Sequence, residues 1–345
     1  METQIFKIDR NNIDKAVMKH LGGIIASGGL VAFPTETVYG LGANAFDDEA
    51  VKSIYVAKGR PSDNPLIVHF ADIDSIKTAV RELTEEAKLL LSVFAPGPLT
   101  VILKKSEKIS KTVTAGLDTV AVRIPSDEIA RELIKSAGVP IAAPSANLSG
   151  KPSPTTPKHV IDDMNTRVDA IIEGGDCRVG VESTVIDLSG DIPTILRPGG
   201  VTFEEIKELL PDTVIDKHIL KSVKANEKPK SPGMKYKHYA PDADVTVVEG
   251  ESEKVKKKID ELLFGNKNLK CGVMTVTDNK YNADLVICAG KNNKDYAKNL
   301  FRVLREFDEN GIDVVFAEFS GNDGYGLAVK NRLYKSAGNK VILVK

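Results

Sequence analysis

Between residues 244 and 345, short apolar runs alternate with stretches of helical spacing, and this alternation restricts the fold more than any other pattern in the chain. Strands that are joined through helices pair in parallel, because the chain must cross one face of the sheet before it can return. The pattern therefore predicts a small, doubly wound, parallel sheet. We expect strands at 245–248, 271–276, 285–288, 314–319 and 341–344, and helices at 252–264, 294–310 and 325–337.

Residues 1–212 mix helical and strand-like stretches without a regular repeat. Too few strand–helix units follow one another for a barrel, so this region predicts a compact α/β domain with a twisted, mixed sheet and helices. We expect helices at 11–28, 48–57, 84–95 and 127–136. We expect strands at 30–33, 66–69, 99–103, 119–124, 140–143, 170–172, 183–188 and 194–196.

A lysine-rich segment separates the two regions. Residues 217–238 contain seven lysines and one acid, and proline, glycine and serine cluster at 229–233. This composition predicts a linker. We therefore expect domains at 1–212 and 244–345, joined by a linker at 213–243. The linker also carries Tyr236, His238 and Tyr239, which a simple spacer does not need.

Composition excludes several classes of protein. The net charge of -1 creates no overall attraction to nucleic acid or to a membrane. Three cysteines without a CxxC pair argue against a disulfide framework or a cysteine zinc site, and we expect no metal site in the protein itself. No apolar run is long enough to span a membrane, and Met1–Asp14 lacks the apolar region of a signal peptide. We expect a cytoplasmic protein with no membrane partner.

The common nucleotide-binding signatures are absent or weak. No G-x-x-x-x-G-K-[ST] motif occurs, so the chain is not a P-loop enzyme. Residues 40–45 fit a loose G-x-G-x-x-A pattern, but six residues separate them from the strand that ends at Phe33, which makes a dinucleotide-binding loop a weak interpretation. No G-x-S-x-G motif occurs either.

Polar residues gather instead where predicted strands end. Thr35, Glu36 and Thr37 follow the strand that ends at Phe33. Sheet proteins place ligand contacts at such exits, although the hydroxyl groups of an ordinary turn explain the same pattern. The loop 142–155 is rich in hydroxyl groups and also carries an amide and a lysine, a composition that suits phosphate binding through backbone N–H groups and hydroxyls.

Four cationic or imidazole side chains lie beside these segments. Lys58 and Arg60 flank a glycine at a helix end, where they either complement the helix dipole or present positive charge to a phosphate or carboxylate. His69 ends an apolar strand, a position where histidine is usually structural. Arg123 lies inside an apolar strand, where an unpaired charge is costly. Its candidate partners are Asp118, the acid near it in sequence, or the anionic group of a ligand.

Taken together, these segments resemble the threonylcarbamoyl-AMP synthase family in its long form, which has a YrdC-type domain followed by a Rossmann-like domain. The resemblance covers essentially the whole chain, and its motifs follow one another in the family's order. The matching stretches are PTETVYGLG at 34–42, KGRP and NPL within 58–66, VRIP at 122–125, PSAN and SGKPSPT within 144–155, GVESTV at 180–185, RPGG at 197–200 and SPGMKYKHYAP at 231–241.

The resemblance implies an ATP-dependent nucleotidyltransferase. Its substrates are L-threonine, bicarbonate or CO2, and ATP, and its products are threonylcarbamoyl-AMP and pyrophosphate. The resemblance further implies that Mg2+ arrives on the nucleotide, and that the product passes to the machinery that modifies tRNAs reading codons that begin with A. A weak contact between the lysine-rich linker and tRNA is a further expectation, beside the simpler interpretation of a solvated spacer.

The resemblance also assigns roles to individual residues. Lys58 and Arg60 are the predicted catalytic cations. Arg123 best fits the carboxylate of threonine, and Tyr236 is expected to close over the nucleotide and exclude water. The predicted threonine-binding residues are Thr37, His69, Arg123 and Ser183. The predicted ATP-binding residues are Arg60, Asn64, Thr119, Ser145, Asn147, Ser153, Arg197 and Tyr236.

Two other functions compete with this one. An RNA-binding module without turnover would fit a basic linker, but the net charge of -1 and the lack of interleaved aromatic and basic residues count against it. A second carbamoyl chemistry, such as the use of carbamoyl phosphate by related domains in hydrogenase maturation enzymes, would be accompanied by cysteine-rich zinc segments, which this sequence lacks.

Overall fold

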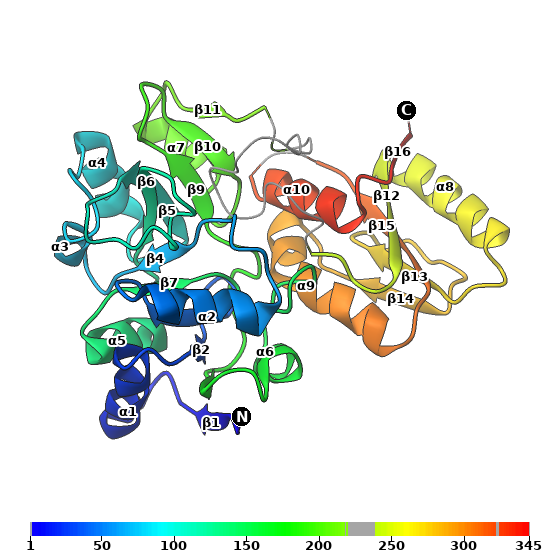
Figure 1. The fold of residues 1–345 in the computed structure, drawn as a ribbon. Coiled ribbons are helices and arrows are strands. Elements are labelled where there is room, and N and C mark those ends of the chain that lie inside the picture. The colour runs from blue at the N-terminus through cyan, green and yellow to red at the C-terminus, as the bar shows by residue number, and fades with distance from the viewer. Residues whose placement is uncertain (1, 218, 220–238, 322–323, 345) are drawn as a thin grey trace. The chain divides into compact units, whose positions relative to one another are not determined.

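The computed structural model describes residues 2–217, 219, 239–321 and 324–344. These residues form two compact units (Figure 1). The first unit includes the described parts of Met1–Ser149, Pro154–Arg178 and Glu182–Lys235, and the second those of Gly150–Ser153, Val179–Val181 and Tyr236–Lys345. The expected domain boundaries at 212 and 244 stay predictions, since most of the expected linker lies outside the described residues.

In chain order the first unit contains β1 (Gln4–Lys7), α1 (Lys15–Ala26), β2 (Val31–Phe33), β3 (Gly40–Asn44), α2 (Asp48–Lys58), β4 (Ile67–His69), α3 (Ile73–Ile76), α4 (Glu85–Phe94), β5 (Leu99–Lys104), β6 (Thr119–Arg123), α5 (Glu128–Ala137), β7 (Ile141–Ala143), α6 (Pro157–Met164), β8 (Ala170–Glu173), β9 (Thr184–Asp187), β10 (Thr194–Arg197), α7 (Phe203–Leu209) and β11 (Val214–Ile215). Within the described residues, its strands form one sheet of eleven in the order β1-β8-β2-β3-β7-β4-β6-β5-β9-β10-β11. Parallel and antiparallel neighbours both occur, which confirms the mixed sheet.

Apolar side chains cover both faces of this sheet. On one face, α1 and α5 pack over Val31 and Phe33, and on the other α2, α4 and α6 pack over alternate strand residues such as Ala32. Helices α1 and α5 approach each other closely at Gly22, where a Cβ atom would lie only 2.4 Å from the backbone of Ser136. The large sheet is therefore the middle layer of an α/β unit, and its central strands are buried.

Strand β3 is an element that the sequence does not predict. It pairs antiparallel with β2, so residues 34–39 connect the two strands of a hairpin. A Cβ atom at Gly42 would lie 2.7 Å from Ile141 Cγ2 and 2.8 Å from Phe33 Cε1. Glycine at this position lets the Phe33 ring pack across the strand. Residues 40–44, which loosely fit a dinucleotide-binding pattern, form a buried strand instead.

The second unit contains β12 (Asp244–Gly250), α8 (Ser252–Gly265), β13 (Cys271–Thr275), β14 (Leu285–Cys288), α9 (Asn293–Glu309), β15 (Val314–Phe319), α10 (Gly326–Ser336) and β16 (Val341–Val344). Its described strands pair only in parallel, in the order β14-β13-β15-β12-β16, which confirms the predicted parallel sheet. Because β15 lies between β12 and β13, the two middle strands are exchanged relative to the usual dinucleotide-binding order.

A single buried carboxylate organises the carboxyl end of this parallel sheet. Glu318 on β15 accepts hydrogen bonds from Thr275 Oγ1 at 2.6 Å and from Asn279 Nδ2 at 3.0 Å, and also from the Thr277 and Tyr281 hydroxyls. Burial alone would raise the pKa of Glu318, but these hydrogen bonds outweigh it and lower the pKa. The carboxylate thus fixes the loop that joins β13 to β14.

Replacement of Glu318 by glutamine should destabilise this unit by about 3 kcal/mol, because an amide group cannot accept from all of these donors. Native-state hydrogen exchange of the β13 and β15 amides measures the loss. The exposed Glu253 on α8 supplies the matched control, and Glu253→Gln should change exchange by less than about 0.5 kcal/mol. Equal protection in both variants would show that the Glu318 network adds no stability.

Candidate active site

The register of three adjacent strands places His69, Arg123 and Thr100 in one row. His69 on β4 is aligned with Arg123 on β6, and Arg123 is aligned with Thr100 on β5. Residues directly opposite one another on neighbouring strands share a face of the sheet. All three side chains are buried, with exposed fractions of 3%, 4% and 0%. The row joins two predicted threonine-binding residues to a threonine that the sequence did not single out.

The partner of Arg123 is an acid distant in sequence rather than Asp118. Its Nη2 atom lies 2.7 Å from Glu36 Oε1 and donates to Thr37 Oγ1 at 2.9 Å. Glu36 comes from the connection between β2 and β3, so the hairpin brings the acid to the strand end. Among the described residues, Arg123 Nε is buried without a hydrogen-bond partner. The guanidinium is thus held on one side and keeps a donor for a further acceptor.

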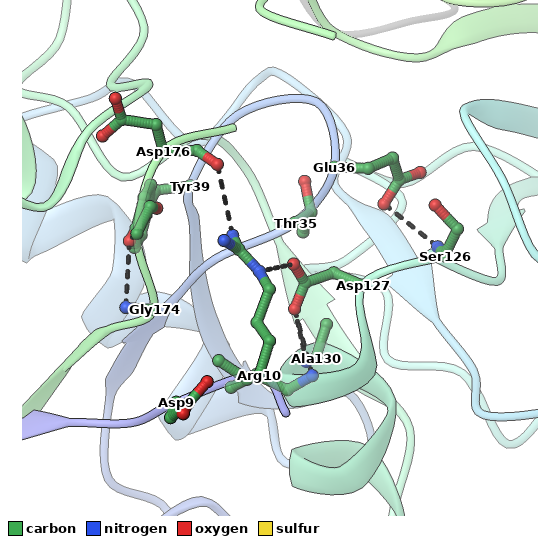
Figure 2. Close-up of polar contacts among 12 residues, drawn as sticks. Asp9, Arg10, Thr35, Glu36, Tyr39, Ser126, Asp127, Ala130, Gly174 and Asp176 are labelled. Carbon is green, nitrogen blue, oxygen red and sulfur yellow. Dashed lines mark hydrogen bonds and ion pairs between the residues drawn. The ribbon is translucent and has the colours of Figure 1, made fainter. Parts of the chain in front are cut away.

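A second layer of contacts holds Glu36 in place (Figure 2). Its other oxygen accepts the backbone N–H of Ser126 at 3.0 Å, just before α5. Asp127 caps the same helix and binds Arg10 Nε at 2.9 Å, and Arg10 reaches on to the carbonyl of Asp176 at 3.3 Å. Burial raises the pKa of Asp127, and the Arg10 guanidinium opposes that rise. Glu36 is therefore anchored by a helix end that is itself anchored.

Tyr39 closes the same connection from its far end (Figure 2). Its hydroxyl donates to the carbonyl of Gly175 at 2.8 Å and accepts the N–H of Gly174 at 3.2 Å. Burial raises the pKa of Tyr39 well above its usual value, so the hydroxyl stays neutral. The connection between β2 and β3 is thereby held at Glu36 and at Tyr39.

His69 is uncharged in this environment. Burial, with a smaller contribution from the nearby Arg123 charge, lowers its pKa to about 3. Its Nδ1 atom lies 3.1 Å from the carbonyl of Ile67, and because a carbonyl only accepts, Nδ1 carries the hydrogen.

The low pKa of His69 predicts a pH-dependent stability. Between pH 3 and 6.5 the unfolded chain binds a proton at this histidine and the folded chain does not, so acidification favours unfolding. The free energy of unfolding should fall by about 1.4 kcal/mol per pH unit below 6.5 from this group alone. Denaturant unfolding of wild type and His69→Asn from pH 5 to 7 should show the shallower slope in the variant. The exposed His20 is the matched control for loss of a histidine, and equal slopes for wild type and His69→Asn would contradict the assignment.

Ser183, a predicted threonine-binding residue, contacts Arg197, a predicted ATP-binding residue. Arg197 donates through Nε to the Ser183 carbonyl and through Nη2 to Ser183 Oγ, both at 3.1 Å. The Thr100 hydroxyl lies 2.8 Å from Ser183 Oγ. These contacts connect β5, β10 and the residue just before β9, so the two predicted substrate sets meet at one hydroxyl group.

Lys58 is bound to the loop that follows β7. Helix α2 ends at Lys58, and Gly59 caps it with a φ of 60° that suits glycine, while the Lys58 side chain is buried. Its ammonium group donates to the carbonyls of Ser145 and Asn147, each at 2.5 Å. Ser145 Oγ in turn donates to Asn147 Oδ1 at 2.5 Å. The structure thus brings together Lys58, Ser145 and Asn147, with the ammonium on loop carbonyls.

The side-chain amide of Asn64 is a further candidate ligand contact in this unit. Its side chain is fully buried, and within the described part of the chain neither amide atom has a hydrogen-bond partner. Buried amide groups are rarely left unpaired. Tyr55 fixes the Asn64 backbone through a hydrogen bond of 2.9 Å to its carbonyl. Arg60 lies four residues earlier on the same segment, directly after Gly59.

The structure does not bring three of the predicted ATP-binding residues together with these groups, for a different reason in each case. Thr119 starts β6, whose other end carries Arg123, and a strand of this length separates the two by about 13 Å. Ser153 is buried but belongs to the second unit. Tyr236 lies outside the described residues.

Glu36 and Thr100 are the residues that sequence reasoning left without a role. Glu36 lies inside a motif that drew attention, so its position next to hydroxyl residues was a usable signal. Thr100 gave no signal, since one hydroxyl in an apolar strand is common and its partner Ser183 is 83 residues away.

Comparisons with known proteins give the family of the chain. A family described as "Telomere recombination" matches residues 23–199, and one described as "Threonylcarbamoyl-AMP synthase, C-terminal domain" matches residues 201–338. The chain is 50% identical to the threonylcarbamoyl-AMP synthase of Pyrococcus abyssi over 97% of its own length and 98% of the relative's. It is 49% identical to that of Bacillus subtilis, over 91% and 90% of the two chains.

A solved structure gives the same result. The crystal structure of P. abyssi Sua5 complexed with L-threonine is 49% identical in sequence and has a TM-score of 0.95. The match covers 99% of this chain and 100% of that one. Identity at this level over essentially the full length, with both family matches in order, shows the family. The chain belongs to the threonylcarbamoyl-AMP synthase family.

Proposed function

We propose that this chain joins L-threonine, bicarbonate or CO2, and ATP to form threonylcarbamoyl-AMP, with release of pyrophosphate. One observation carries the proposal: Thr100 is paired with Arg123 across β5 and β6, and its hydroxyl lies 2.8 Å from Ser183 Oγ, which also accepts a hydrogen bond from Arg197. A buried site of this kind suits an amino-acid anion beside a second guanidinium, an arrangement that transfer of an adenylyl group from ATP to a carboxylate requires.

At the amino-acid end, Arg123 binds the carboxylate of threonine. Glu36 and Thr37 take up one side of the guanidinium, while the buried Nε has no partner among the described residues. A carboxylate matches this remaining donor and gains a charge-assisted hydrogen bond. Thr37, neutral His69 and Ser183 surround it with hydroxyl and imidazole groups, which suit the threonine hydroxyl and the carbamate.

At the nucleotide end, the carbamate attacks the α-phosphate of ATP and pyrophosphate leaves. Little covalent chemistry is asked of the protein, which must align the groups and neutralise charge. Arg60 and Arg197 supply the guanidinium groups, and Asn64 supplies an amide with both atoms available. Lys58 contributes by holding Ser145 and Asn147, whose loop faces the phosphates in this proposal. The nucleotide contacts of Thr119, Ser153 and Tyr236 stay predictions from the sequence.

Mg2+ enters this proposal as part of the nucleotide. Among the described residues, no group of three His, Cys, Asp or Glu side chains is placed to hold a metal ion. A Mg2+ ion bound through phosphate oxygens and water needs no such cage. The arginines then supply the protein's positive charge to the triphosphate, and Lys58 holds the loop that faces it.

The product is a reactive mixed anhydride, so we place this enzyme directly before a threonylcarbamoyl transfer to tRNA, in the cytoplasm. The lysine-rich segment 217–238 would give a weak contact with the acceptor tRNA. In the part of the chain that the structure describes, no helix combines the length and apolar character needed to cross a membrane.

The decisive experiment measures pyrophosphate release from ATP and Mg2+ with and without threonine and bicarbonate, in the absence of tRNA. Release that requires both threonine and bicarbonate is the expected result. ATP binding without any release would overturn the proposal and favour an RNA-binding module without turnover. Release with carbamoyl phosphate in place of threonine and bicarbonate would favour the other carbamoyl chemistry.

A further inference from the structure

Two side chains lie within hydrogen-bond distance of the Ser183 hydroxyl. Arg197 Nη2 lies 3.1 Å from Ser183 Oγ, and Thr100 Oγ1 lies 2.8 Å from it. Ser183 and Thr100 are both fully buried. The direction of each hydrogen bond therefore decides which hydrogen atom, if any, remains available to a substrate.

What each group can do limits these directions. A guanidinium only donates, so Ser183 Oγ accepts from Arg197. Either hydroxyl of the Thr100–Ser183 pair can donate to the other, and in each case one of the two buried hydroxyl hydrogens has no acceptor among the described residues. A buried hydrogen without an acceptor is costly, so the pair favours a substrate oxygen that accepts it.

When Thr100 donates, Ser183 Oγ accepts from both Thr100 and Arg197, and its own hydrogen points away from both. A substrate oxyanion that accepts this hydrogen favours that direction. We propose that Thr100 is a positioning residue of the amino-acid site: together with Arg197 it makes the Ser183 hydroxyl a hydrogen-bond donor to an oxyanion of the substrate, its carboxylate or carbamate. The strand register supports this placement, because Thr100 lies directly beside Arg123, the proposed carboxylate ligand. The inference rests on the function proposed above and extends it by a residue that does not itself bind substrate.

The test separates loss of the Thr100 hydroxyl from loss of its shape. Thr100→Val removes the donor and keeps the branched side chain, and Thr100→Ser keeps the donor. The valine variant should raise KM for threonine by about tenfold, which corresponds to one hydrogen bond, and should change KM for ATP less than about twofold. The serine variant should stay within about threefold of wild type. A threonine KM that is unchanged in Thr100→Val, or raised equally in Thr100→Ser, would overturn the inference.

A double-mutant cycle with Ser183→Ala tests the route of the effect. If Thr100 acts through Ser183, adding Thr100→Val to Ser183→Ala should change KM for threonine by less than about twofold. A further tenfold loss in the double variant would show that Thr100 acts independently of Ser183. Thr213→Val is the matched control, because it removes another buried hydroxyl, which donates to the Leu210 carbonyl at 2.7 Å, without touching Ser183.

The same experiment distinguishes this inference from the proposed function. Threonine-dependent pyrophosphate release by the wild-type protein tests the function, and the variants are compared only against that activity. If wild type releases no pyrophosphate, the function fails. If wild type is active and Thr100→Val is equally so, the inference alone fails. Should the valine variant not fold, Thr100→Cys, whose thiol is a weaker donor, replaces it with the same expected direction and the same outcome that would refute the inference.

Discussion

Replacement of Arg123 by methionine should lower kcat/KM for threonine by about a thousandfold, which corresponds to about 4 kcal/mol of lost transition-state binding. The guanidinium is 4% exposed, so its hydrogen bonds to an anion form away from water, where they are strong. Methionine keeps much of the volume and removes the charge. Threonine-dependent pyrophosphate release measures the effect, and saturation with threonine shows whether kcat or KM carries it.

The control for this prediction removes the Glu36 carboxylate together with the Arg123 guanidinium. Arg123→Met alone leaves Glu36 buried without its cation, which is strongly destabilising in its own right. The double variant Arg123→Met, Glu36→Leu removes both charges and should recover much of the lost stability. It should not recover threonine turnover. Restored turnover in the double variant would mean that Arg123 serves only to neutralise Glu36.

Replacement of Lys58 by methionine should lower kcat/KM for ATP by about a hundredfold. The ammonium group donates to the carbonyls of Ser145 and Asn147 at 2.5 Å. Without it the loop loses these two links to α2, although the backbone N–H of Ser149 still donates to the carbonyl of residue 58. The Ser145 hydroxyl and the Asn147 amide are then less firmly positioned to bind the nucleotide. ATP titrations at saturating threonine and bicarbonate measure the change.

Lys52 provides the matched control for Lys58. It lies on the same helix, is exposed and binds Glu49 on the surface, so Lys52→Met should leave KM for ATP within about twofold of wild type. Positioning and direct charge stabilisation by Lys58 predict different kinetics. A loss that falls mainly on KM supports positioning of the loop, and a loss confined to kcat would show that the ammonium acts on the transferring phosphate.

Local sequence pattern predicted the second unit well. The predicted strands 285–288, 314–319 and 341–344 coincide with β14, β15 and β16. Parallel strands that are covered on both faces appear as nearly continuous apolar runs, and such runs are easy to recognise. In the first unit the helix expected at 11–28 is shorter, since Asp14 caps α1 and the helix begins at Lys15.

Pattern failed where a strand carries little side-chain information. Strand β3 contains Gly40 and Gly42, and glycine contributes nothing to an alternation of apolar and polar residues. The strand exists because the Phe33 ring and Ile141 fill the space that side chains would otherwise take. That space is created by neighbours in the sheet, so it is visible only in three dimensions.

The sequence by itself determined the residue types of the site, the segments that carry them and, through its motifs, the family. Tertiary structure alone decided which of these residues touch. Glu36 pairs with Arg123 across 87 residues, Lys58 binds Ser145 across 87, and Thr100 meets Ser183 across 83. Local periodicity reports which face of a strand is buried, but it does not report which strand lies beside it. These partnerships depend on the strand order of the sheet, and burial then makes each of them strong, because buried charges and hydroxyls must find partners.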